Sequence, residues 1–270
     1  MNVLIIFAHP EQRSLNGTIK NAAVAYLEAA GHQVEVSDLY QMNWKSAVDG
    51  RDYLHHQPED RLFVGNVSKV ALEKQALAPD IVAEQEKILR ADLIIFQFPL
   101  WWFSMPAILK GWVDRVFTKG FGYGAGKRYG GGKFLGKKGM LIVTAGSDTH
   151  SFSLNGINGH MDDLLFPIHH GIMWYSGITP LQPFIVYNSN HISEAHVAET
   201  LQTLKARIDS LETLDPIHYY SITAGDYDEN DVLKTHLRDN KSGLAAHRKS
   251  SLGLTFQEVV NADPASTENQ

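Results

Sequence analysis

Cysteine is absent from this chain of 270 residues. Disulfides, thiolate nucleophiles and cysteine-based zinc sites are therefore excluded, and a reducing compartment is favoured. Basic residues are in the minority: 24 Lys and Arg against 30 Asp and Glu give a formal net charge of -6, which disfavours a general nucleic-acid-binding protein. No apolar run is long enough for a membrane span, and residues 1–8 lack the features of a signal peptide. We therefore expect a cytoplasmic protein with no membrane span.

Two common nucleotide-binding signatures are also missing. No Gly-x-Gly-x-x-Gly follows the first apolar segment, and the glycine-rich stretch 120–134 does not complete a Walker pattern. The glycine density of this stretch instead predicts a mobile flap. Within it, Tyr123 and Tyr129 either line a pocket or lie on a loose surface loop.

Apolar and amphipathic segments alternate along the first 215 residues. Buried strands are expected at residues 3–8, 33–37, 93–96, 140–144 and 184–187, with helical spacing of apolar residues between them. This alternation predicts an α/β fold with a doubly wound, five-stranded parallel sheet in the order 2-1-3-4-5. Residues 1–215 would form this domain, and residues 216–270 an irregular C-terminal extension.

A polar loop, residues 9–16, joins the first strand to the first helix. Ser14 or Asn16 is expected to cap this helix, and the free main-chain amides at its start form a ready anion site. His9 and Arg13 add positive charge to the same place. The loop therefore predicts either a phosphate site or simple capping.

Three adjacent aromatic residues, 101–103, follow the third strand. Pro99 is expected to end that strand, Ser104 to cap the next helix and Pro106 to lie in its first turn. The three rings belong either to the core or to a wall for a flat conjugated ligand such as a flavin. The second interpretation is supported by their position, since open α/β sheets bind ligands at the carboxyl ends of their strands. Residues 145–152 follow the next strand, and their main-chain amides could reach the polar edge of such a ring.

Several motifs occur in order and at matching spacing: His9-Pro10, Ser14 and Asn16, and residues 37–40, 79–85, 96–103, 106–112 and 153–156. Together they resemble the flavodoxin-like NAD(P)H:quinone oxidoreductases, in particular the long branch that contains FAD. The resemblance covers residues 3–215 and extends only weakly beyond them. It implies a homodimer with the active site at the interface.

The resemblance also implies the reaction. NAD(P)H would pass hydride to N5 of FAD and leave, and a quinone or other aromatic acceptor would then take two electrons in a ping-pong cycle. FAD is favoured over FMN as the cofactor. No metal is expected, because the remaining ligands of a metal-binding relative fall here on Trp174 and Tyr219, beside His169, His170 and His218.

Roles for individual residues follow from the same resemblance. FAD contacts are assigned to His9, Arg13, Ser14, Leu15, Asn16, Pro99, Leu100, Trp101, Trp102, Phe103, Thr144, Ala145, Gly146, Ser147 and Phe152. Catalytic roles are assigned to Tyr123, Gly146, Ser147, Phe152 and Asn158. The acceptor pocket is assigned to Trp102, Phe103, Tyr123, Tyr175 and His191, with Tyr123 and Tyr175 reaching across the dimer.

Three positions depart from the pattern of the family. Phe152 and Asn158 stand where its best-studied members place Tyr and His, which stabilise negative charge on the reduced flavin. Losing one such donor typically costs about 2.7–4 kcal/mol, or about 10²–10³ in rate, although the amides of Gly146 and Ser147 could retain part of the effect. Val197 replaces an Arg near the adenine end, and Arg13 is a candidate substitute. We expect activity at a reduced rate or with an altered donor preference.

A second function stays open. Some relatives are ancillary subunits of potassium-efflux systems, so the chain could be a regulatory flavoprotein. The basic stretch 241–249 would then dock a partner, where the simpler interpretation is a solvated face. A one-electron carrier is disfavoured by the aromatic wall and the long extension.

Overall fold

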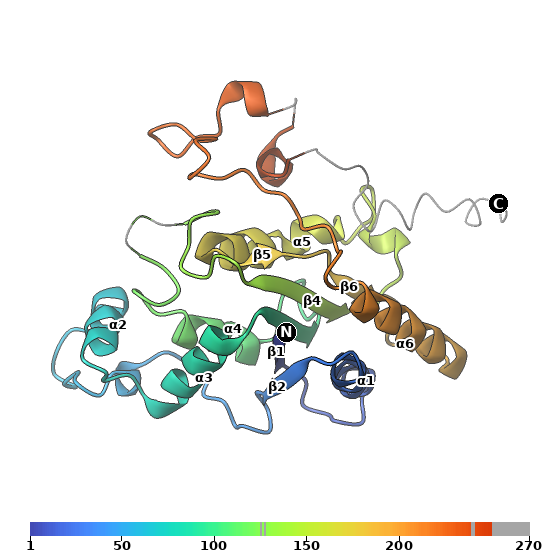
Figure 1. The fold of residues 1–270 in the computed structure, drawn as a ribbon, viewed down its shortest axis with the longest axis horizontal. Helices are drawn as coiled ribbons and strands as arrows, with labels where there is room; N and C mark the ends of the chain where they lie inside the picture. Colours follow the sequence, from blue (N-terminus) through green and yellow to red (C-terminus); the bar gives the residue numbers. More distant parts are fainter. Residues whose placement is uncertain (125, 127, 239–240, 250–270) are drawn as a thin grey trace.

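A parallel sheet occupies the centre of the molecule (Figure 1), in a computed structural model that describes residues 1–124, 126, 128–238 and 241–249. Its strand order is β2-β1-β3-β4-β5, and β6 also pairs with β4. The strands are β1 (Asn2–Phe7), β2 (Gln33–Asp38), β3 (Leu93–Pro99), β4 (Lys138–Thr144), β5 (Thr179–Pro180) and β6 (Phe184–Val186). The predicted doubly wound fold and strand order are confirmed.

The last strand position holds two short strands, where the sequence predicted one. β5 pairs with Lys138 and Gly139 at the start of β4, and β6 pairs with the end of β4, both in parallel. Pro183 lies directly before β6 and has no N–H to donate, which accounts for the interruption. The sheet therefore has six strands instead of the predicted five.

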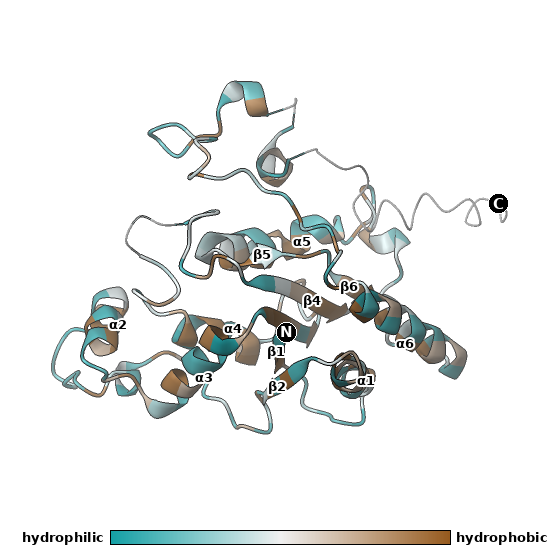
Figure 2. Cartoon of the chain, viewed as in Figure 1, coloured by the Kyte–Doolittle hydropathy of each residue, from teal (hydrophilic) through white to brown (hydrophobic). Residues whose placement is uncertain are grey.

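Helices cover both faces of the sheet (Figures 1 and 2). α1 (Leu15–Ala29) and α6 (Glu194–Asp209) pack on one face, against Val3 and Ile5 of β1. The other face, which Leu4 and Ile6 join, carries α3 (Pro79–Arg90), α4 (Ala107–Val116) and α5 (Met161–Ile168). The remaining helical segments are α2 (Val64–Glu73), the 3-10 turns η1 (Gly50–Asp52), η2 (His150–Phe152), η4 (Thr235–Leu237) and η5 (Gly243–His247), and the π-helix η3 (His169–Trp174). No described helix is long and apolar enough to cross a membrane.

The predicted cap of the first helix agrees with the structure. Ser14 caps α1, Ser193 caps α6, and Gly31 ends α1 with a φ of 83°. The predicted cap at Ser104 is wrong, because α4 starts at Ala107 with Pro106 as its N-cap. Ser104 instead belongs to a tight turn that precedes the helix.

The chain beyond α6 returns to the α5 side of the sheet. Arg248 Nη1 lies 2.8 Å from a carboxylate oxygen of Asp162 in α5, and the indole N–H of Trp174 donates to the carbonyl of Tyr220 at 3.0 Å. Among residues 216–238 and 241–249 there is no α-helix, and η4 and η5 are short 3-10 turns. Residues 250–270 of the predicted extension lie outside the described residues.

Candidate functional site

Hydrogen bonds around His9 fix the loop between β1 and α1. The main-chain N–H of Glu11 donates to Nδ1 of His9 at 3.1 Å, and Ser14 Oγ lies 3.0 Å from the same nitrogen. The carbonyl of Glu11 also lies 3.1 Å from Nδ1, so this nitrogen faces both a donor and an acceptor, and its role follows the tautomer. The hydroxyl of Ser14 donates to the carbonyl of Glu11 at 2.6 Å. Together these contacts hold the ring of His9 beside the start of α1.

The first amides of α1 have no partner within the described chain. Ser14 Oγ accepts from the N–H of Gly17 at 3.1 Å, and the first intrahelical bond runs from the N–H of Thr18 to the carbonyl of Ser14. The N–H groups of Leu15 and Asn16 precede that bond. Free amides and the positive end of a helix dipole together attract anions. The hydroxyl of Ser14, by contrast, already donates and accepts inside the protein.

A buried polar chain lies beneath these amides. Asn16 Nδ2 donates to Thr144 Oγ1 at 2.8 Å, and Gln97 Nε2 donates to the carbonyl of Asn16 at 2.8 Å. All three residues are buried. Asn16 Oδ1 has no hydrogen-bond partner in the described chain. A buried acceptor without a partner is costly, so this oxygen calls for a donor such as a ligand hydroxyl.

These groups open on a cavity of about 340 Å³ at the carboxyl ends of the strands. Its lining comprises His9, Ser14, Leu15, Asn16, Pro99, Leu100, Trp101, Thr144, Gly146, Ser189 and Asn190. All except the last two were predicted cofactor residues. Asn190 reaches the cavity because Gly146 has no side chain: a Cβ there would lie 2.6 Å from Asn190 Nδ2. The signal for Ser189 and Asn190 was their place after β6, at the same sheet edge.

The aromatic residues form a strained turn beside this cavity. Trp101 and Ser104 exchange two main-chain hydrogen bonds at 3.0 Å, and the central residues Trp102 and Phe103 have φ of 49° and 60°. Two consecutive positive φ values describe a type I′ turn, which normally contains Asn and Gly. For bulky residues this backbone costs roughly 1–2 kcal/mol each. Such strain is typical of functional sites.

The rings of this turn are exposed, so the alternative that places them in the core is wrong. Trp102 is 93% exposed, and Trp101 and Phe103 are each close to half exposed. The ring of Trp101 lies 6.1 Å from that of His9, at the border of the cavity. The remaining interpretation, a wall for a flat ligand, is the one that the geometry favours.

Other predicted cofactor and catalytic residues are absent from the lining of this cavity. Arg13 is exposed and bound to Glu11 at 3.1 Å; its guanidinium lowers the pKa of that carboxyl to about 2. Ala145 is buried directly after β4, and the exposed Ser147 accepts from the N–H of Asn188 through its carbonyl. Phe152 is buried, with its ring 5.9 Å from that of Tyr187. Asn158, partly buried, donates its main-chain N–H to the carbonyl of Ser151.

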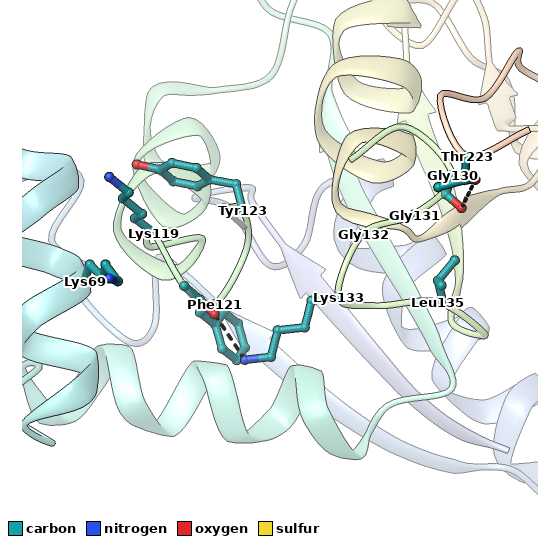
Figure 3. Close-up of a pocket in the computed structure, with 12 residues that line it drawn as sticks. Lys69, Lys119, Phe121, Tyr123, Gly130, Gly131, Gly132, Lys133, Leu135 and Thr223 are labelled. Carbon is teal, nitrogen blue, oxygen red and sulfur yellow. Dashed lines mark hydrogen bonds between the residues drawn. The ribbon is translucent and has the colours of Figure 1, made fainter. Parts of the chain in front are cut away.

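The predicted acceptor-pocket residues lie in separate places. Tyr123 lines a second cavity of about 760 Å³ (Figure 3), and burial, followed by the nearby phenol of Tyr175, raises its pKa. Tyr175 contacts the ring of Tyr129 edge-on at 5.0 Å. Tyr129 stacks on His170 at 4.7 Å, so it is neither on a loose loop nor in the lining of this cavity. His191 is exposed after β6.

The paired histidines before Gly171 lie among aromatic rings. His170 stacks on Phe166 at 4.5 Å and contacts Tyr219 edge-on at 4.9 Å. Burial lowers the pKa of His169 to about 3 and that of His170 to about 4. The described residues contain no group of three or more His, Asp or Glu side chains that could hold a metal ion.

Comparison with known families agrees with this architecture. Residues 1–210 match the family described by its flavodoxin-like fold. This chain belongs to that family. The predicted recognition is thereby confirmed for the flavodoxin-like core, which includes every element that lines the cavity.

Relatives of this flavodoxin-like protein are similar along nearly its whole length. The ribosyldihydronicotinamide dehydrogenase-like protein traD of Penicillium crustosum is 43% identical over 94% of this chain and 98% of its own. The NAD(P)H dehydrogenase [quinone] 1 of Rattus norvegicus is 37% identical over 96% of this chain and 97% of its own. A solved structure from Klebsiella pneumoniae, provisionally described as a quinone reductase, is 46% identical with a TM-score of 0.88, and covers 92% of this chain and 99% of its own.

Proposed function

We propose that this chain is an NAD(P)H dehydrogenase (quinone), which oxidises a dihydronicotinamide and reduces a quinone or similar aromatic acceptor by two electrons. The observation that carries the proposal is the pairing of an anion cradle and an exposed aromatic wall at one cavity. One relative named above is an NAD(P)H dehydrogenase [quinone] and the other is described as ribosyldihydronicotinamide dehydrogenase-like, and each matches more than nine-tenths of this chain. None of the relatives named above belongs to a potassium-efflux system, so that alternative gains no support.

A flavin fits the residues at the cavity. The free amides of Leu15 and Asn16 and the adjacent ring of His9 suit a phosphate, and the unpaired Asn16 Oδ1 suits a ribityl hydroxyl. Membership in the flavodoxin-like family also indicates a flavin. We propose FAD over FMN because the motifs resemble the FAD-containing branch. The bound flavin supplies the two-electron redox chemistry.

The chain itself orients the reactants and excludes water. Pro99, Leu100 and the turn 101–103 would flank the ring system, and Trp102 and Phe103 would cover its exposed side. The N–H groups of Gly146 and Ser147 have no acceptor in the described chain, so they are free to donate to developing negative charge. Phe152 has no hydroxyl to contribute. The two amides would therefore stabilise that charge without a hydroxyl group at position 152.

We further propose a cytoplasmic homodimer. The site is open on its aromatic side, and Tyr123 and Tyr175 do not line the cavity of their own chain. In a dimer they would complete the partner's acceptor pocket. Analytical ultracentrifugation of the flavin-loaded protein tests this proposal, and a monomer with full activity would contradict it.

The function is tested with purified protein reconstituted with FAD. We expect a bound flavin with absorbance near the visible bands of FAD, its release as FAD by mass spectrometry, and oxidation of NADH or NADPH that depends on menadione. Initial rates at several menadione concentrations should give parallel double-reciprocal lines, as a shared slot requires. A colourless protein that oxidises neither dihydronicotinamide would refute the proposal.

A further inference from the structure

The larger of the two cavities described above lies between α2 and residues 119–124 and 130–135 of the glycine-rich stretch (Figure 3). Its lining comprises Lys69, Lys119, Gly120, Phe121, Tyr123, Gly124, Gly130, Gly131, Gly132, Lys133, Leu135 and Thr223. Three of these described residues are positively charged and none is negatively charged. The cavity is therefore electropositive, although the chain as a whole carries a net charge of -6.

Two of the lysines are held at the cavity by neutral groups. Lys133 Nζ lies 4.8 Å from the centre of the Phe121 ring and 3.4 Å from the carbonyl of Gly120, and Lys119 Nζ donates to Asn66 Oδ1 at 3.2 Å. An ammonium group has three N–H donors, so these contacts leave donors for a ligand and no carboxylate to neutralise them. Lys69 differs, because it forms an exposed ion pair with Glu73 at 3.3 Å.

Tyr123 connects this electropositive cavity to the proposed acceptor pocket. Its hydroxyl lies over the first turn of α2, where a Cβ on Gly65 would approach it to 3.3 Å. The N-cap of α2, Phe63, provides no side-chain hydrogen bond to this first turn. A phenol with a raised pKa stays neutral at physiological pH and can donate.

We propose that Lys119 and Lys133 bind the diphosphate tail of the hydride donor, and that they make the enzyme prefer NADH and NADPH over dihydronicotinamide donors without phosphate. The inference rests on the proposed function, since it requires that Tyr123 lies at the acceptor pocket. NADH carries a doubly charged diphosphate next to its nicotinamide riboside, and the free riboside carries none. Two ammonium groups at the cavity that Tyr123 lines favour the first donor and are indifferent to the second.

The choice of hydride donor is informative because the names of two relatives refer to different donors. One is named after ribosyldihydronicotinamide and the other after NAD(P)H. If the lysines act on the tail, the preference depends on charge at this cavity, and raising the salt concentration weakens it.

The test compares two donors with one acceptor. We would measure kcat/KM for NADH and for dihydronicotinamide riboside, with menadione in excess, in wild type and in Lys119→Met/Lys133→Met. We expect wild type to favour NADH and the ratio of the two kcat/KM values to fall at least tenfold in the double variant. Lys119→Arg/Lys133→Arg keeps both charges and should restore most of the ratio.

Lys205→Met provides the control for each single lysine change, because it also removes one positive charge and Lys205 lies on α6, paired with Asp209 at 2.7 Å. Its ratio should equal that of wild type. Each variant is first checked for wild-type flavin content and thermal unfolding; if Lys119→Met/Lys133→Met fails to fold, the single variants are used. A ratio within twofold of wild type, or a wild type that favours the riboside, overturns the inference and leaves the proposed function standing. Wild-type protein that oxidises neither donor refutes the proposed function itself.

Discussion

The two sides of the smaller cavity are built in opposite ways. On the polar side, buried side chains from α1, β3 and β4 hold one another: Gln97 donates to the carbonyl of Asn16, and the side chain of Asn16 donates to Thr144. On the aromatic side, Trp102 and Phe103 are exposed to solvent at the centre of a type I′ turn. The backbone of such a turn normally contains Asn and Gly. We call these the polar half and the aromatic half of the site.

The contrast indicates different sources of order. The polar half is organised before any ligand arrives, because its geometry is set by buried hydrogen bonds within one chain. The aromatic half stores strain and leaves apolar surface uncovered, so its order depends on what covers it. Substitutions should therefore affect stability and activity in opposite directions in the aromatic half, and chiefly affect cofactor affinity in the polar half.

The largest expected effect comes from repairing the turn. Trp102→Asn/Phe103→Gly gives the type I′ turn its preferred residues, so the free energy of unfolding of the flavin-free protein should rise by about 1–3 kcal/mol. Turnover should fall by about 10²-fold or more, since the wall is lost and each tenfold loss equals about 1.4 kcal/mol of transition-state stabilisation. Urea denaturation and steady-state kinetics with menadione measure the two quantities.

Trp102→Tyr/Phe103→Tyr is the control for that variant, because it retains both rings and the strain. It should keep turnover within about fivefold of wild type and gain no stability. If the repaired turn were as active as wild type, the aromatic half would have no functional role.

A smaller loss is expected from the polar half. Asn16→Leu keeps the volume but removes the donor to Thr144 and the free acceptor at the cavity. The Kd for FAD should rise by about 10–100-fold, or about 1.4–2.7 kcal/mol, because buried partners are left unsatisfied. Fluorescence titration of apoprotein with FAD measures this. Thr144→Val removes only the acceptor that orients Asn16, so it should cost less; an unchanged Kd in both variants would contradict the assigned cradle.

Two buried histidines, His169 and His170, should make the free energy of unfolding depend on pH. Neither belongs to the polar half or the aromatic half of the site. The folded pKa values of His169 and His170 are about 3 and 4, below the ordinary value of about 6.5, so the unfolded chain binds the extra protons. The free energy of unfolding should therefore fall as pH decreases from about 6.5 towards 4, by up to about 1.4 kcal/mol per pH unit for each histidine. Urea denaturation at several pH values measures the slope.

His170→Phe removes one of the two titratable groups and keeps an aromatic ring between Phe166 and Tyr129. The slope of the free energy of unfolding against pH should therefore decrease by up to about 1.4 kcal/mol per pH unit, which corresponds to one bound proton. His236→Gln, at an exposed position, should leave the slope as in wild type. An undiminished slope in His170→Phe would mean that other groups carry the pH dependence.

The smallest effect is expected at Arg13. Its side chain is 90% exposed and already paired with Glu11, and such ion pairs contribute about 0–1 kcal/mol. Arg13→Ala should therefore change the Kd for FAD by less than about threefold. A loss above tenfold would instead make Arg13 part of the polar half, as the resemblance suggested.

The parts of the fold and site that the sequence predicted were those encoded locally. Apolar residues in short runs or in alternation located β1 to β4. Ser14 was predicted as a cap because it directly precedes a segment with helical periodicity. The polar half was predicted for the same reason, since its loop and helix start are continuous in sequence. Trp102 and Phe103 gave no turn signal, because type I′ turns are recognised by Asn and Gly. The contact of Asn190 with Gly146 and the lysine cavity depend on distant segments, which no local pattern encodes.

The end of the described chain bears directly on the lysine cavity. The carbonyl of Tyr129 accepts from Ser221 Oγ at 3.0 Å and from the N–H of Ile222 at 3.2 Å, and Thr223 itself lines the cavity. A Cβ on Gly130 would lie 2.4 Å from Ser221 Oγ. A protein shortened to residue 215 would retain the whole sheet and lose one wall of this cavity. Under the role proposed for Lys119 and Lys133, the length of the chain past α6 would therefore set the choice of reductant, while the residues of the smaller cavity stay unchanged.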